Sequence, residues 1–126
     1  MDNSIEERLK ELKIEDFIWL IYIGIIFLSW YSNDLERRYF VYNDINSKEK
    51  YRKIMILIFS ILVIVYYYFL NDSVSSINNL SSDVSCEKKR LNYLSMIASL
   101  LIFISGIILL YIAINDKDID VELAFN

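Results

Sequence analysis

The chain has 126 residues, of which 56% are hydrophobic and 24% are charged, and its formal net charge at pH 7 is -4. It contains no histidine, no proline, two glycines and one cysteine. Without histidine, the commonest general base and metal ligand is missing, and two glycines cannot build a glycine-rich nucleotide loop. A negative net charge argues against binding of nucleic acid. We therefore expect a protein that is not an enzyme, with no catalytic residue, no metal site and no cofactor.

Charged residues are absent from three windows of the chain, residues 17–33, 54–71 and 91–115. An α-helix needs about 20 mostly apolar residues to cross a hydrocarbon core of roughly 30 Å, and each window has about this length. Because there is no proline, we expect straight helices. The pattern predicts an all-α membrane protein with three transmembrane helices in a single domain over residues 1–126.

The N-terminal segment, residues 4–15, has the pattern of a short amphipathic helix. Ser4 begins a capping-box motif, and Ile5, Leu9 and Leu12 recur at helical spacing. We expect this helix to precede the first span. It either continues directly into that span or is joined to it by a bend that lays it on the membrane surface.

The first predicted span covers residues 17–32. Trp19 and Tyr22 lie near one end of it, and Trp30 and Tyr31 lie near the other. Tryptophan and tyrosine are enriched at both membrane–water interfaces, so these residues mark the two ends of the span.

A basic helical hairpin is predicted over residues 33–53. The helix of the first span continues into water as far as a turn in residues 43–46, and Asn46 or Ser47 caps the second helix. The first and second spans then form a long antiparallel hairpin that protrudes from the bilayer. Its cations are candidate ligands for lipid headgroups: Arg37, Arg38, Lys50 and Lys53.

The second predicted span covers residues 54–70 and is followed by a polar loop, residues 71–90, rich in Ser and Asn. The third span covers residues 91–114 and precedes an acidic tail, residues 115–126. Apolar and acidic residues alternate in the tail, which leaves open that it docks on a surface as an extended segment. The apolar residues of this alternation are Ile119, Val121, Leu123 and Phe125.

Orientation in the membrane follows from the distribution of Lys and Arg. They number three in the N-terminal segment, six in the hairpin, three in the second loop and one in the tail. With three spans the two sides carry seven and six, so their number discriminates little, but their density favours a cytoplasmic hairpin. We expect the N-terminus outside and the C-terminus in the cytoplasm; the identity of the membrane is left open.

No charged residue lies within a span, which argues against a pump, a coupled transporter or a voltage-gated channel. Small or polar residues instead recur every seven positions, a spacing that keeps them on one side of a helix in a left-handed bundle. We interpret them as helix-packing seams. Alternatively, the third helix faces a symmetry partner and lines a pore. The candidate seam residues are Tyr22, Ser29, Ser60, Tyr67, Ser95, Ser99 and Gly106.

These features predict a small non-enzymatic multi-pass membrane protein, a structural, accessory or assembly subunit of a membrane complex. Its expected partners are the lipid bilayer and either further copies of itself or a larger membrane protein. The alternative is a homo-oligomeric pore, such as a small channel or a holin-like permeabilising protein.

Overall fold

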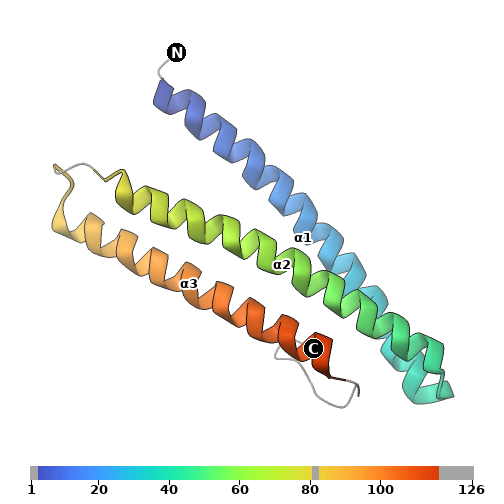
Figure 1. The fold of residues 1–126 in the computed structure, drawn as a ribbon. Helices are drawn as coiled ribbons and strands as arrows, with labels where there is room; N and C mark the ends of the chain where they lie inside the picture. The colour runs from blue at the N-terminus through green and yellow to red at the C-terminus, as the bar shows by residue number, and fades with distance from the viewer. Residues whose placement is uncertain (1–2, 81–82, 117–126) are drawn as a thin grey trace. The chain divides into compact units, whose positions relative to one another are not determined.

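The computed structural model describes residues 3–80 and 83–116, with side chains from Ile5 onward. Within this part of the chain all regular structure is helical, and no strand is present. The helices are, in chain order, α1 (Asn3–Tyr42), α2 (Ile45–Asn78) and α3 (Cys86–Asn115) (Figure 1). The predicted all-α class is confirmed for the described residues.

Helix α1 runs without interruption from Asn3 to Tyr42, 40 residues, or about 60 Å at 1.5 Å per residue. The short amphipathic helix predicted over residues 4–15 is therefore not a separate element. Neither glycine nor proline separates it from the apolar segment that follows, so nothing interrupts the backbone hydrogen bonds. The guanidinium of Arg8, 3.1 Å from Glu11 and 4.0 Å from Glu15, joins successive turns across this region.

Helix α2 is longer at its C-terminal end than predicted. The polar segment predicted as a loop over residues 71–90 contributes residues 71–78 to α2 and residues 86–90 to α3. Asparagine and serine are weak helix formers, but they lack the steric clash of proline and the backbone freedom of glycine. The connection is accordingly confined to residues 79–85.

Helix α3 begins with a side-chain cap and contains the whole of the predicted third span. Ser85 is the N-cap, and its hydroxyl accepts a hydrogen bond from the amide of Lys88 at 3.2 Å. At the other end, the amide of Asp116 donates to the carbonyl of Ile112 at 2.8 Å.

Two helices of the described chain, α2 and α3, are long and apolar enough to cross a membrane. In the most apolar window of α3 only 6% of the residues are buried, against 28% in α2. A core helix of a soluble protein would be mostly buried, and the apolar window of α3 is not. The membrane span predicted in α1 stays a prediction.

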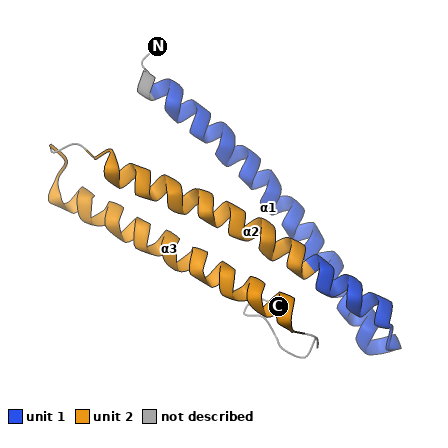
Figure 2. Ribbon diagram, viewed as in Figure 1, with its two compact units in different colours: residues 1–54 blue, residues 55–126 orange. Residues whose placement is uncertain are grey.

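The chain divides into two compact units, residues 1–54 and residues 55–126 (Figure 2). The first contains α1 and the start of α2. The second contains the rest of α2 and α3, which lie antiparallel and side by side (Figure 1). The single domain predicted over residues 1–126 stays a prediction.

Candidate functional site

Helices α2 and α3 meet along residues that recur every seven positions on both helices. The hydroxyl oxygens of Ser73 and Ser99 lie 3.0 Å apart and share a hydrogen bond. Seven residues along each helix, Gly106 faces Tyr66. A Cβ atom at Gly106 would lie 2.9 Å from Cδ2 of Tyr66 and 3.5 Å from Cγ2 of Val63. The missing side chain therefore allows the Tyr66 ring to lie against the backbone of α3.

A further step of seven residues along each helix reaches Phe59 on α2 and Ala113 on α3. Both side chains are buried. Since a spacing of seven keeps a stripe facing one direction in a left-handed helix pair, we expect the contact to continue along both helices. We call this contact the α2–α3 seam; it consists of Phe59, Tyr66 and Ser73 on α2 and Ser99, Gly106 and Ala113 on α3.

On α3, two of the three predicted seam residues contact α2. Ser99 bonds Ser73, and Gly106 lies against Tyr66, whereas Ser95 is exposed. A pore lined by the three α3 residues together would require Ser99 and Gly106 to give up these contacts.

On α2, the predicted residues Ser60 and Tyr67 each follow by one position a residue of the α2–α3 seam. The hydroxyl of Ser60 donates to the carbonyl of Ile56 at 2.7 Å, within its own helix. The ring of Tyr67 is 59% exposed and its centroid lies 5.8 Å from that of Phe103. Tyr67 therefore borders the seam.

Phe59 and Tyr66 were not predicted from the sequence, because only small and polar residues were considered as seam residues on each helix. The small residues of α3 are matched on α2 by large ones, as Gly106 is by Tyr66. A search for large residues at the same spacing of seven as the small ones would have found both.

The predicted residues of α1, Tyr22 and Ser29, lie in the first unit, and both are half-buried. The ring centroid of Tyr22 is 5.8 Å from that of Trp19, in an edge-on arrangement. The carbonyl of Ser29 accepts a hydrogen bond from the hydroxyl of Ser32 at 2.7 Å.

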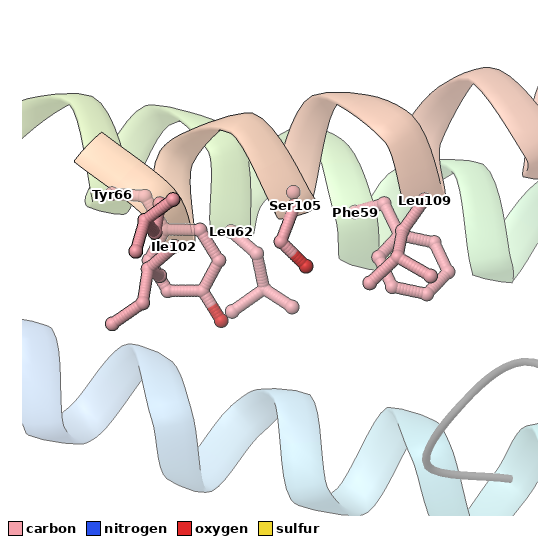
Figure 3. A pocket seen from close by; sticks show the side chains of 8 residues that line it. Phe59, Leu62, Tyr66, Ile102, Ser105 and Leu109 are labelled. Carbon is pink, nitrogen blue, oxygen red and sulfur yellow. The ribbon is translucent and has the colours of Figure 1, made fainter. Parts of the chain in front are cut away.

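An apolar groove of about 480 Å³ lies beside the α2–α3 seam (Figure 3). The hydroxyl groups in its lining belong to Tyr66 and Ser105. Figure 3 shows both side chains among aliphatic neighbours. Such a lining is suited to apolar contacts and contains no carboxylate or imidazole for proton transfer. The groove is lined by Phe59, Leu62, Tyr66, Leu101, Ile102, Ser105, Gly106 and Leu109. Within residues 3–80 and 83–116, no three His, Cys, Asp or Glu residues are grouped so as to hold a metal ion.

The turn between α1 and α2 is built by Asn43 and Asp44. Asn43 has a φ of 54°, the left-handed region that asparagine tolerates better than most residues. The Asp44 carboxylate accepts hydrogen bonds from the amide of Asn46 at 3.1 Å and from the hydroxyl of Ser47 at 2.9 Å. Asp44 therefore caps α2, and the predicted cap at Asn46 or Ser47 was wrong by two or three residues.

The same contacts stabilise the charged form of Asp44. The hydrogen bond from the Ser47 hydroxyl lowers the pKa of this carboxyl most, and the amides of Ser47 and Asn46 lower it further. Partial desolvation opposes them, and the pKa remains below its usual value.

Close to this turn, the first unit has four buried residues and a cation–π contact. The ammonium of Lys48 lies 5.3 Å from the ring centroid of Tyr39, a cation–π contact that joins the start of α2 to the end of α1. Leu35 is 1% exposed. The four buried residues are Ser32, Leu35, Ser47 and Tyr51.

All four cations proposed as lipid ligands, Arg37, Arg38, Lys50 and Lys53, are exposed. The two arginines share one carboxylate, because Asp34 lies 3.9 Å from Arg37 and 3.1 Å from Arg38. Asp34 and the two arginines together carry a formal charge of +1, and Glu36 lies next to Arg37 in the sequence.

Four large apolar side chains at the end of the hairpin are exposed, which sequence reasoning did not single out. Tyr42 is 77% exposed and Val41 is 65% exposed. Contiguous exposed apolar residues rimmed by charge are typical of interaction surfaces. We call this surface the apolar tip; it consists of Phe40, Val41, Tyr42 and Ile45.

Comparison with known proteins finds no matching family model, no matching curated protein and no matching solved structure.

Proposed function

We propose that the chain is a small integral membrane protein without enzymatic activity, and that it serves as a structural, accessory or assembly subunit of a membrane complex. The observation that carries this proposal is the surface of α3. The helix contacts α2 along one narrow seam, while most of its apolar side chains remain exposed. Such a surface is suited to lipid and to neighbouring apolar helices, either from further copies or from a larger membrane protein.

The proposal includes a third span, formed by residues 17–32 of α1. This segment is helical and free of charge. Trp19 and Trp30, near its two ends, are 64% and 71% exposed, as expected of side chains at the two membrane interfaces. In this arrangement the N-terminus is outside, and the hairpin and the C-terminus are cytoplasmic.

The exposed cations of the hairpin support an additional contact with anionic lipid. A juxtamembrane Lys or Arg contributes about 1 kcal/mol near an anionic surface. Lys53 directly precedes the second span, and Arg37 and Arg38 follow the first by about one and a half turns. Such contacts fix the orientation of the hairpin at the membrane.

A homo-oligomeric pore, either a small channel or a holin-like protein, is the second candidate function. Exposed hydroxyls on α3, at Ser95 and Ser105, favour it, because a narrow polar path needs such groups. The accessory role is favoured over the pore because Ser99 and Gly106 are engaged with α2.

Oligomeric state and ion flux in the same lipid bilayers test the two functions. We expect the purified chain in lipid nanodiscs to form a defined homo-oligomer, or to retain a larger partner from its native membrane, as measured by native mass spectrometry. We also expect no ion flux in liposomes. A monomer that retains no partner would contradict the accessory role, and reproducible flux would favour the pore.

A further inference from the structure

The apolar tip lies farther from the membrane than the lipid headgroups reach. In the proposed placement the first span ends at residue 32, and α1 continues as a regular helix to Tyr42. Ten residues at 1.5 Å each place Tyr42 about 15 Å beyond the hydrocarbon core. The headgroup layer on each side is only about 5 to 8 Å thick. Lys50 lies at headgroup level and Arg37 lies at the outer edge of the headgroup layer, about 8 Å beyond the hydrocarbon core. The apolar tip lies in water unless a protein covers it.

The C-terminal segment, residues 116–126, has the complementary chemistry. It contains four acidic residues against one lysine, and its apolar residues alternate with acidic ones. The hairpin, residues 34–53, contains six cations against four acidic residues. Within it, Arg37 and Arg38 share the single carboxylate of Asp34 next to the apolar tip.

Membrane topology brings the two surfaces to the same compartment. Helices α2 and α3 are antiparallel. The end of α3 therefore leaves the membrane on the side where α2 begins, which is also the side of the apolar tip. In the proposed placement, the C-terminal end of α3 in one copy and the apolar tip of its neighbour are thus on the same side of the membrane.

We infer that the apolar tip, together with Arg37 and Arg38, binds residues 116–126 of a second copy of this chain. The inference rests on the proposed function, and it names the contact through which copies associate. Each copy offers one tip and one acidic segment, so the contact is head-to-tail and can close a ring of copies. The apolar side chains of the segment cover Phe40, Val41 and Tyr42, and its carboxylates pair with the two arginines.

Photo-crosslinking of the full-length chain in its membrane tests the contact. Benzoylphenylalanine is placed at position 42, in a mixture of isotopically heavy and light chains, and adducts are identified by mass spectrometry. We expect heavy–light adducts between position 42 and residues 116–126. Benzoylphenylalanine at position 93 is the matched control, because Tyr93 is an exposed tyrosine at the opposite end of α3 and should give no such adduct. Adducts only with lipid, with another protein or within one copy would overturn the inference, as would no adduct.

A charge exchange separates pairing from mere proximity. Replacing both arginines, Arg37→Glu with Arg38→Glu, should lower the adduct yield about ten-fold, because like charges then face each other. Adding Asp118→Lys and Asp120→Lys should restore the yield. An unchanged yield in the first variant, or no recovery in the second, would overturn the inference.

Failure of the proposed function is recognised separately. Labelling with an impermeant reagent first establishes whether residues 43 and 120 face the same side of the membrane. If they face opposite sides, the proposed placement is wrong, and the inference falls with it. If they face the same side and no adduct forms, only the inference is wrong.

Discussion

The two glycines of the chain have different surroundings, and the difference shows where close packing matters. A Cβ atom at Gly106 would lie 2.9 Å from Tyr66, closer than real Cβ atoms approach other atoms. At Gly24, no described atom lies within 4 Å of the corresponding position. Gly106 is therefore required by the approach of α2, whereas Gly24 only lowers the helix propensity of α1.

We expect Gly106→Ala to destabilise the folded chain by about 1 to 3 kcal/mol, the usual cost of overpacking. Gly24→Ala is the matched control and should be neutral or stabilising by up to about 1 kcal/mol, since alanine is the better helix former. Reversible unfolding in mixed micelles, followed by circular dichroism, measures both. Equal effects at the two positions would contradict the close contact at Gly106.

Asn43 ends α1 in a conformation that few residues adopt easily, with a φ of 54°. We expect Asn43→Gly to retain full stability, and Asn43→Val to lose about 1 to 2 kcal/mol, because a side chain branched at Cβ is strained in the left-handed region. Asn33→Val, at an exposed helical position of α1, serves as the control and should have a small effect. The same unfolding measurement tests the three variants.

The Asp44 cap makes the turn sensitive to acid. Because the pKa of Asp44 is lower in the folded chain than its usual value, the stabilisation by this group is present above the usual pKa of an aspartate. It is lost as the pH falls through the lowered pKa. Ser47→Ala removes the hydrogen bond that lowers the pKa of Asp44 most, so it should raise this pKa toward its usual value. Carbon-13 NMR of the labelled carboxyl measures the shift; an unchanged pKa in this variant would show that the hydroxyl does not stabilise the carboxylate.

At the scale of elements, α2 and α3 form a pair in which large residues on one helix meet small ones on the other. The Ser73–Ser99 hydrogen bond extends this pairing into the polar end of α2. That end, residues 71–78, has the composition of a loop yet is helical. A contact with α3 helps to keep it so, because helix stability in proteins comes largely from tertiary packing.

The energy of this hydrogen bond is open to measurement. A double-mutant cycle of Ser73→Ala and Ser99→Ala should give a coupling of about 0.6 kcal/mol, and at most about 1.7 kcal/mol, as for other hydrogen bonds between membrane helices. Pairing Ser73→Ala with Ser95→Ala gives the control, since Ser95 is exposed, and its coupling should be close to zero. A coupling of zero in both cycles would mean that the bond contributes nothing in lipid.

At the scale of the whole molecule, the proposed arrangement of three membrane spans would put the two connections on opposite sides of the bilayer. The single native cysteine, Cys86, is exposed at the first residue of α3, beside the second connection, and reports directly on the side of that connection. An exposed Asn43→Cys in a Cys86→Ser background reports on the hairpin.

We expect an impermeant maleimide, applied to sealed vesicles, to label Cys86 from one side of the membrane and Asn43→Cys only from the other side. The reason is that, in the proposed placement, α2 crosses the bilayer between the two positions. Asn79→Cys, also in the Cys86→Ser background, is the control and should label from the same side as Cys86. Labelling of all three positions from one side would show that α2 does not span the membrane.

The positions of the apolar helices could be predicted from sequence because charge and hydrophobicity vary so sharply along the chain. Ala113 and Gly106 could also be assigned to one stripe of α3, since their spacing alone determines it. Helix limits were less predictable. Neither the continuity of α1 through residues 13–17 nor the cap at Asp44 follows from composition, because neighbouring residues of similar propensity compete for the same role.

The sequence by itself determined the all-α class, the apolar segments α2 and α3, and the basic character of the hairpin, because these depend only on the local order of residue types. Only the tertiary structure decided that Tyr66, and not Tyr67, faces Gly106, that Ser99 bonds Ser73, and that the apolar tip is exposed. Within residues 54–70 of α2 every position except Ser60 is apolar, so hydrophobicity does not distinguish the faces of this segment. The partner face is selected by shape, where the ring of Tyr66 fits the space left by Gly106, and shape belongs to the helix pair and not to either helix alone.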